Sequence, residues 1–296
     1  MEISNKKILI IGDVFVDRYV CGEITRLSPE GPFPVLKCSA RYEQLGGAAN
    51  VANNLRKSGT SVFLIGVIGE DESGKILTHL LNEENINYFL PYSKRQTSTK
   101  TRYFHKDQQL YRVDYETTLP IGQQEENKIL EYLELFSPDY ILISDYNKGL
   151  LTPKIFAELF NYQKPVIANI KPENVAYLIN KPNTTIILND KEYKDLLSHY
   201  PVSTMEALYE LLKIDTFIVT RGVNGVDYIY NGNFNHLDAH QVELVSSIGA
   251  GDTFSAYFTM GISTGRNVHD SIILANKAAG IAVSKHGTSI VSLEEI

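Results

Sequence analysis

The chain has 296 residues, of which 43% are hydrophobic and 21% are charged, an ordinary globular composition that can bury a large core. The formal net charge of -7 argues against nucleic acid or an anionic membrane as the main partner. Two cysteines, Cys21 and Cys38, argue against a disulfide framework. No apolar run reaches membrane-spanning length, and the polar start lacks a signal core, so we expect a cytoplasmic protein.

Short apolar runs alternate with helical patterns through most of the chain. Strands are expected at 7–13, 62–66, 140–144, 165–168, 185–188 and 216–220. Helices are expected at 123–136, 153–161, 173–179, 191–198, 204–212, 250–263 and 268–285. A hairpin that turns at Asn231-Gly232 is expected over 225–237. This alternation predicts an α/β domain with a mostly parallel sheet that helices cover on both faces.

Two stretches depart from the alternation. Residues 18–45 contain three prolines and short β-like pieces, and residues 97–116 alternate around a polar turn, which predicts a hairpin. We expect both to form a small lid sheet within a single domain that spans 1–296. Four lid residues are expected to be exposed and apolar: Val35, Leu36, Tyr103 and Tyr111. They predict a homodimer formed by lid-on-lid packing.

The segment Gly69–Ile76 nearly matches a phosphate-binding P-loop, with Gly, four residues and Gly-Lys. Ile76, however, stands where the magnesium-binding Ser or Thr belongs. We therefore interpret Ser73 as the cap of a helix that continues to about Glu83.

The segment Val245–Phe254 predicts the end of a strand, a glycine turn and the start of a helix. Gly249 and Gly251 allow the backbone to approach a ligand, and the free amides of the first helical turn make an anion site. A carboxylate at Asp252 would repel a bound phosphate, so the presence of an acid at this position needs an explanation. One reason is general-base catalysis on a hydroxyl that attacks a phosphoryl group. The alternative is that Asp252 only caps the helix.

Polar residues follow most of the predicted strands. They are Asp13, Asp17, Asp145, Lys148, Asn169, Lys171, Asn189, Glu192, Thr220, Gly222 and 249–252. Any one of them is usually only a turn former. Because the carboxyl ends of parallel strands share the edge where α/β sheets bind ligands, the whole row predicts a site.

Several motifs together resemble the ribokinase-like sugar kinases of the PfkB family over nearly the whole chain. They are Gly12–Tyr19, Arg26–Val35, Gly46–Ala52, Gln108–Asp114, Ser144–Gly149 and Gly249–Thr253. Within that family the nearest resemblance is to the heptose-phosphate kinases of ADP-heptose synthesis. The Arg-x-Ser-Pro-Glu and Ser-Asp-Tyr-x-Lys-Gly motifs carry this narrower resemblance.

The resemblance implies a ribokinase-like three-layer sandwich with a mostly parallel central sheet flanked by helices, plus a small β lid. It implies an ATP- and Mg²⁺-dependent phosphotransferase that acts on a sugar hydroxyl. The substrate would be a heptose 7-phosphate, converted to the 1,7-bisphosphate by in-line phosphoryl transfer.

The resemblance also implies residue roles. Asp252 would be the base, and the anion hole would comprise Gly249, Ala250 and Gly251. The sugar side would be formed by Asp13, Asp17, Gly46, Gly47, Asn50 and Asp145. A phosphate already on the sugar would be held by Arg112, Lys148 and Lys171. The nucleotide would be held by Asn189, Glu192, Thr220, Gly222 and Asn276. Glu192 would help to place Mg²⁺ indirectly.

The chain departs from the family pattern in three places. Asn169-Ile170-Lys171 replaces Asp-Pro-Lys, Ile187-Leu188-Asn189 replaces Thr-Pro-Asn, and Ser246-Ser247-Ile248 replaces Asp-x-Thr. In many relatives that last aspartate helps to bind a monovalent cation, so we expect potassium activation to be weak or absent. Two alternatives stay open: a kinase of another sugar or a nucleoside, and a degenerate fold that binds nucleotide or sugar phosphate without catalysis.

Overall fold

The computed structural model describes residues 6–296; residues 1–5 of the predicted domain lie outside the described residues. In this part of the chain, nine strands form the main sheet in the order β15-β14-β13-β12-β11-β10-β1-β4-β6. Their bounds are β1 (Lys7–Gly12), β4 (Ser61–Ile65), β6 (Asn87–Phe89), β10 (Tyr140–Ser144), β11 (Val166–Asn169), β12 (Thr184–Asn189), β13 (Thr216–Thr220), β14 (Val226–Tyr230) and β15 (Asn233–Leu237). All neighbours from β6 to β13 are parallel, and β14 and β15 are antiparallel.

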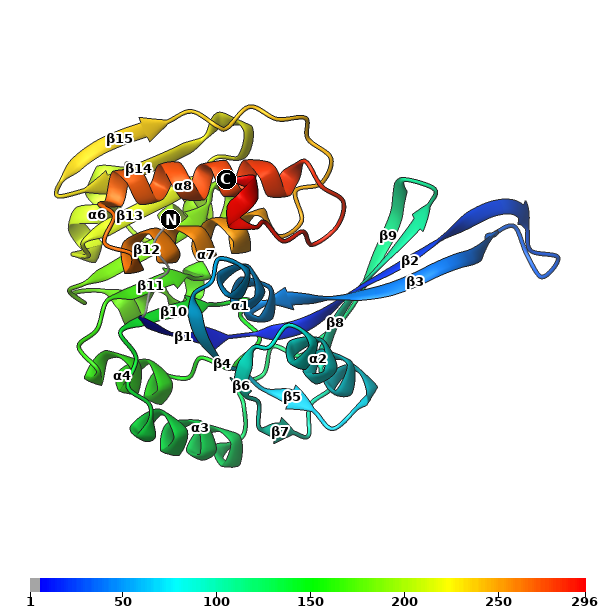
Figure 1. The fold of residues 1–296 in the computed structure, drawn as a ribbon, viewed down its shortest axis with the longest axis horizontal. Helices are drawn as coiled ribbons and strands as arrows, with labels where there is room; N and C mark the ends of the chain where they lie inside the picture. Colours follow the sequence, from blue (N-terminus) through cyan, green and yellow to red (C-terminus); the bar gives the residue numbers. More distant parts are fainter. Residues whose placement is uncertain (1–5) are drawn as a thin grey trace.

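Helices cover both faces of this sheet (Figure 1). One face carries α1 (Ala48–Lys57), α2 (Glu72–Glu83), α7 (Ala250–Ser263) and α8 (Val268–Val283). The other carries α3 (Gln123–Leu135), α4 (Pro153–Asn161), α5 (Asp190–His199) and α6 (Met205–Leu212). Alternate residues of β1 serve the two layers, since Ile8 and Ile10 pack on the first face and Leu9 and Ile11 on the second. The expected three-layer α/β architecture is confirmed.

Three local predictions are wrong. The cap of α2 is Asp71, not Ser73, because the Asp71 carboxylate accepts a hydrogen bond from the amide of Gly74 at 2.8 Å. The segment η1 (Pro172–Leu178) is a 3₁₀ helix, in which the buried Pro172, Val175 and Leu178 recur every three residues. No strand precedes Gly249, because residues 238–249 are irregular. Four short elements carried no usable pattern: β5 (Ile68–Gly69), β7 (Tyr92–Ser93), η2 (Gly222–Asn224) and η3 (Leu293–Glu295).

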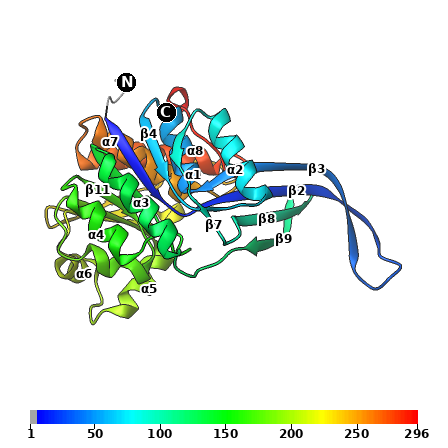
Figure 2. The same ribbon diagram turned by 90° about the horizontal axis from the view of Figure 1, so that it is seen from below.

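The lid is a separate four-stranded sheet in the order β3-β2-β8-β9. Its strands are β2 (Val14–Leu27), β3 (Pro34–Gly47), β8 (Ser98–His105) and β9 (Gln108–Tyr115). It projects from the edge of the main domain, and the β2–β3 hairpin reaches furthest (Figures 1 and 2). Because β2 already begins at Val14, Asp17 lies on a lid strand rather than at the end of a main-sheet strand.

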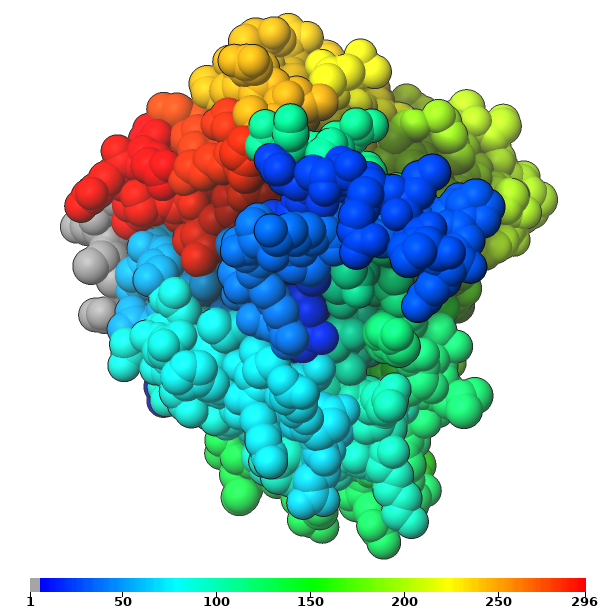
Figure 3. All heavy atoms as spheres, turned by 90° about the vertical axis from the view of Figure 1, so that its right-hand side faces the viewer, coloured from blue at the N-terminus to red at the C-terminus, as the bar shows by residue number. Residues whose placement is uncertain are grey.

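The lid exposes aromatic side chains, but not all of those predicted. Tyr111 is 52% exposed and stacks on Tyr103 with ring centroids 4.8 Å apart, whereas Tyr103, Val35 and Leu36 are half-buried. Further large apolar side chains exposed on the lid are Leu27, Phe33, Tyr42, Leu110 and Tyr115. Figure 3 looks at the end of the molecule from which the lid projects, with the β2–β3 hairpin in front of the main domain.

Within residues 6–296, no helix combines the length and apolarity needed to cross a membrane.

Candidate active site

The glycine turn before α7 has the geometry that an anion site requires. Gly249 has a left-handed φ of 78°, which glycine adopts without strain, and precedes the first helical residue. The amide of Thr253 donates to the carbonyl of Gly249 at 2.9 Å, so the amides of Gly251 and Asp252 come before the helical hydrogen-bond ladder begins. Gly249, Gly251 and Asp252 line a groove of about 180 Å³. The positive end of the α7 dipole therefore faces a space that can hold a phosphoryl group.

Asp252 is buried at the floor of this groove, and both of its oxygens are held. Asn50 Nδ2 donates to Oδ2 at 2.9 Å, and Tyr146 Oη donates to Oδ1 at 2.6 Å. Burial raises the pKa of Asp252 to about 6, in spite of these two hydrogen bonds. No side chain caps α7, so the alternative of a helix-capping aspartate is not what the structure shows. A carboxylate of this kind is ionised at neutral pH and basic enough to take a proton.

Asp17 is the second buried carboxylate of the site. Arg102 Nη1 donates to its Oδ1 at 2.5 Å, and Thr288 Oγ1 donates to its Oδ2 at 2.8 Å. Gly46 lies beside it, where a Cβ would stand 2.3 Å from the Phe15 ring and 3.0 Å from Asp17 Oδ2. Only glycine fits there, which explains the predicted close approach. Sequence reasoning missed Arg102 and Thr288, although Arg102 stands in the alternating lid strand.

Gly47 and Asn50 lie at the start of α1, on the same side of the site as Gly46. Gly47 has a φ of 59° and precedes α1, and Asn50 in the first turn of α1 is buried and bonded to Asp252. The amide group of Asn50 thus holds Asp252, and its predicted contact with the sugar stays a prediction.

Asp13 and Asp145 are buried, but their carboxylates are occupied by the chain itself. Asp13 Oδ2 accepts the amides of Tyr146 and Lys148 at 2.9 and 3.0 Å. Asp145 accepts the amides of Asn147 and Lys171 at 2.7 and 3.0 Å. Burial, together with the nearby charge of Asp145, raises the pKa of Asp13 to about 6. Both aspartates therefore shape the turn after β10, and their predicted contact with the sugar stays a prediction.

The basic residues predicted for a substrate phosphate fall into two places. Lys171 forms an ion pair with Glu192 across the groove that holds Asp252, on the side of Asn189. Lys148 pairs with Glu116 at 2.5 Å, and Arg112 pairs with Asp114 at 2.8 Å, both toward the lid. Lys171 thus pairs with an acid of the groove, and the other two pair with acids of the lid.

Lys100 on β8 was missed by sequence reasoning. It lies opposite Asp17 in the lid register, and its Nζ stands 4.1 Å from the centre of the Phe15 ring and 4.9 Å from that of Tyr146. Within residues 6–296 it forms no ion pair, and burial lowers its pKa. A half-buried ammonium that rests on aromatic faces is available to an anion.

Hydrogen bonds hold Glu192 in the first turn of α5. It forms a capping box with Asn189, in which Glu192 Oε2 accepts the Asn189 amide and Asn189 Oδ1 accepts the Glu192 amide, each at 2.9 Å. No cluster of three metal-ligating side chains occurs within residues 6–296. Asn189 and Glu192 both line the groove beside Asp252. Their oxygens are of the kind that Mg²⁺ prefers, either directly or through water.

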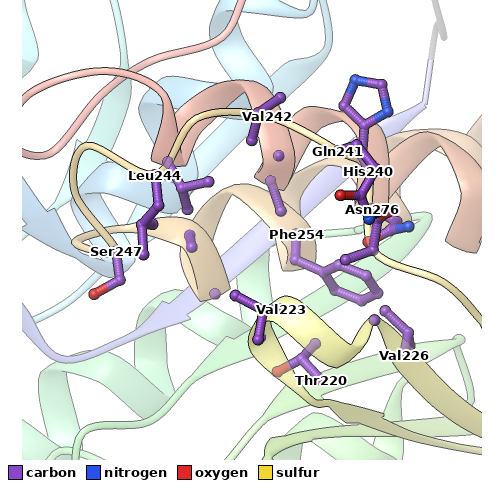
Figure 4. A pocket seen from close by; sticks show the side chains of 18 residues that line it. Thr220, Val223, Val226, His240, Gln241, Val242, Leu244, Ser247, Phe254 and Asn276 are labelled. Atoms are coloured by element: carbon purple, nitrogen blue, oxygen red, sulfur yellow. Dashed lines mark hydrogen bonds between the residues drawn. The ribbon is translucent and has the colours of Figure 1, made fainter.

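A second cavity, of about 260 Å³, opens on the other side of the α7 N-terminus (Figure 4). Its apolar walls include Val223, Val226, Val242, Leu244 and Phe254. The predicted nucleotide residues Thr220, Gly222 and Asn276 line it, together with His240 and Gln241. An apolar slot next to an anion site fits a purine base whose phosphates reach the helix terminus. The loop that supplies His240 and Gln241 is irregular, so no periodic signal could have identified it.

Comparisons with known proteins identify the family of this chain. Residues 5–296 match the model of the pfkB family carbohydrate kinases. The chain is 34% identical over 304 residues to the bifunctional protein HldE of Geobacter sulfurreducens, a match that covers 97% of this chain and 61% of that protein. It thus spans about three fifths of the length of that relative. It is also 33% identical over 305 residues to the D-beta-D-heptose 7-phosphate kinase of Bordetella bronchiseptica, covering 100% of this chain and 96% of that one.

The fold agrees as well. A ribokinase from Thermotoga maritima superposes with a TM-score of 0.77 at 22% identity, covering 98% of this chain and 97% of its own. Phosphofructokinase-2 from Escherichia coli superposes with a TM-score of 0.81 at 18% identity, covering 98% and 96%. The chain therefore belongs to the pfkB family of carbohydrate kinases, which are phosphotransferases with an alcohol group as acceptor.

Proposed function

We propose that this chain phosphorylates a hydroxyl of a sugar that already carries a phosphate, and that the substrate is a heptose 7-phosphate converted to the 1,7-bisphosphate. The main support for a phosphate on the acceptor is the environment of Lys100. Lys100 is a half-buried cation that lies opposite Asp17 in the lid register and has no carboxylate partner in the described residues. Its neighbours Arg112 and Lys148 are held by the lid acids Asp114 and Glu116, which an incoming phosphate can displace. The name of the relative from Bordetella bronchiseptica supports the heptose assignment.

The residues of the site suggest the following reaction. ATP, bound with Mg²⁺, supplies the γ-phosphoryl group. Asp17 accepts hydrogen bonds from the sugar, and Asp252 takes the proton of the attacking hydroxyl as its oxygen bonds to phosphorus and the bond to the ADP oxygen breaks. The amides that follow Gly249 stabilise the charge on the transferred group. Lys171 and Glu192 line the same groove as Asp252, through which the phosphoryl group would pass. Positioning and charge neutralisation thus carry most of the catalysis.

Two alternatives have support of their own. A kinase for another sugar or a nucleoside has the same base and anion hole. A non-catalytic binding protein is favoured by the replacements at Asn169 and Ser246. The held carboxylate of Asp252 and the capping box at Glu192 argue against loss of catalysis.

The test is release of ADP in the presence of Mg²⁺ against a panel of acceptors: heptose 7-phosphate, fructose 6-phosphate, ribose, fructose and adenosine. We expect heptose 7-phosphate to give the highest kcat/KM and the unphosphorylated acceptors to give little. Preference for an unphosphorylated acceptor would refute the proposal, and absence of turnover with every acceptor would favour the non-catalytic alternative. The Asp252→Asn variant gives the background rate.

A further inference from the structure

Tyr146 occupies the centre of the site on a turn with little freedom. Its backbone amide donates to the buried Asp13 at 2.9 Å, directly after β10. Two residues of the turn are left-handed, Asn147 with φ of 54° and Gly149 with φ of 82°. A Cβ at Gly149 would stand 2.1 Å from the carbonyl oxygen of Leu119, so only glycine fits. The backbone that carries the Tyr146 side chain is therefore fixed.

The phenol group of Tyr146 is aimed at the base. Its hydroxyl donates to Asp252 Oδ1 at 2.6 Å, while Asn50 donates to Oδ2 at 2.9 Å. These two contacts fix the plane of the carboxylate, and each oxygen keeps a lone pair for an acceptor hydroxyl. Burial, followed by the charge of Asp252, raises the pKa of Tyr146 well above its usual value. The phenol thus stays a hydrogen-bond donor and does not compete as a base.

The ring of Tyr146 is held between the two sides of the site. It meets the Phe15 ring edge-on, with centroids 5.1 Å apart and planes at 82°. Lys100 Nζ lies 4.9 Å from the ring centre, and Lys171 Nζ lies 5.5 Å from it. Lys100 belongs to the acceptor side, and Lys171 belongs to the groove with Glu192. The ring therefore stands where the acceptor and the transferred phosphoryl group have to meet.

We propose that Tyr146 is a positioning residue for phosphoryl transfer, which orients the Asp252 carboxylate toward the acceptor hydroxyl through the bond from its phenol. The inference deepens the proposed function and rests on the role of Asp252 as the base. A hydrogen bond donated to a carboxylate favours its charged form. Tyr146 therefore also extends the pH range in which Asp252 can take a proton.

Other charges act on Asp252 as well. The groups that face it or share its groove are Asp17 on β2, Lys100 on β8, Asp145 and Tyr146 on the turn, Lys171 after β11, and Glu192 on α5. Apart from Tyr146 itself, all of these remain in a Tyr146→Phe variant, which removes only the hydroxyl. A change in the titration of Asp252 in that variant therefore reports the phenol.

The first test is the pH profile of kcat for Tyr146→Phe, with the acceptor that gives the highest turnover. The wild-type rate should fall below about pH 6, where Asp252 becomes protonated. In the variant this acid limb should move up by about one pH unit, the effect of losing one hydrogen bond to a charged group. We also expect the plateau value of kcat to fall about tenfold, while the KM for ATP changes less than about twofold.

The matched control is Tyr177→Phe, which removes the hydroxyl of a partly exposed ring stacked on Phe156, in a helix outside the groove. It should leave the profile unchanged. An unaltered kcat and acid limb in Tyr146→Phe would overturn the proposal. So would a reduced kcat with the acid limb in its wild-type place, because the ring would then act only as a wall.

A second measurement needs no substrate. In protein labelled with ¹³C at the aspartate carboxyl carbon, the signal that disappears in Asp252→Asn belongs to Asp252. Its titration midpoint should lie higher in Tyr146→Phe than in the wild type. An unchanged midpoint would overturn the inference. A raised midpoint in a protein that phosphorylates none of the acceptors would support the contact and refute the proposed function, so the two failures are distinguishable.

Discussion

Thr288 donates a hydrogen bond of 2.8 Å to Asp17, although 271 residues separate them in the chain. Because the single hydroxyl proton of Thr288 is used in this bond, the buried Tyr19 donates its own hydroxyl to Thr288 Oγ1, also at 2.8 Å. The amide of Thr288 donates to Gln44 on β3 at 3.0 Å. The end of the chain thus fastens the inner end of the lid to the main domain, and the orientation of Asp17 depends on it.

We expect Thr288→Val to weaken both the site and the fold. The substitution leaves the Tyr19 hydroxyl buried without a partner, which costs about 1–3 kcal/mol of the free energy of unfolding. Asp17 would keep only Arg102, so the KM for the sugar should rise several-fold while the KM for ATP stays the same. Thr288→Ser keeps the hydroxyl and is the matched control. Equal losses in the two variants would show that packing of the methyl group, not the hydrogen bond, matters.

Asp252→Asn should lower kcat by a factor of about 100 or more, since general-base help is worth about 10²–10⁴. The amide has nearly the shape of the carboxylate, and its oxygen can still accept a bond from Asn50 or Tyr146, so the KM for the sugar should change little. Steady-state ADP release measures both values, and thermal unfolding checks the fold. Turnover close to the wild type would remove Asp252 from the role of base.

The two lysines beside Tyr146 should have different effects. Lys100→Met should raise the KM for a sugar phosphate about tenfold or more, because a charge-assisted contact is lost, and should leave the KM for ATP nearly unchanged. Lys171→Met should act mainly on kcat and the KM for ATP, since Lys171 pairs with Glu192 in the phosphoryl groove. The resemblance to the sugar kinases assigned the acceptor phosphate to Lys171, together with Arg112 and Lys148. If Lys171→Met shifts only the KM for the sugar phosphate, the assignment from the sequence is right and the one from the structure is wrong.

Potassium should have little effect on turnover. The family pattern given with the resemblance has an acid at the position of Ser246. The Ser246 hydroxyl accepts the amide of Ile248 at 3.3 Å, and its own amide donates to Val283. A neutral hydroxyl does not offset the charge of a cation as a carboxylate does. The rates in sodium, potassium and tetramethylammonium chloride at equal ionic strength should therefore agree. Ser246→Asp is the informative counterpart, and a strong potassium response in the wild type would reveal other ligands.

The lid should mediate a homodimer. Tyr111 and its neighbours expose aromatic and aliphatic surface on a sheet that projects from the main domain (Figure 1). Sedimentation velocity should show a dimer for the wild type and a monomer for Tyr111→Glu. The control is Leu135→Glu, which places the same charge on a side chain that is 87% exposed at the end of α3, away from the lid. A wild type that stays monomeric at high concentration would contradict this prediction.

The sequence by itself determined the layered α/β architecture and the glycine turn that begins α7. Apolar runs such as Ile8–Ile11 and Ile141–Ile143 specify buried parallel strands, because every residue in them must face one helical layer or the other. The Gly249–Asp252 motif specifies free amides next to a carboxylate, because a glycine turn and a helix start are local structures. These features depend on residues that are close together in the chain.

Only the tertiary structure decided which side chains hold Asp17 and Asp252. Arg102 reaches Asp17 across 85 residues, and Tyr146 reaches Asp252 across 106. Such contacts depend on strand register and on the packing of the lid, which no local pattern encodes. In the same packing, Asp13 and Asp145 accept hydrogen bonds from backbone amides, and Lys100 forms no ion pair within the described residues. The residue types predicted the chemistry of the site, and the fold determined which groups contact one another.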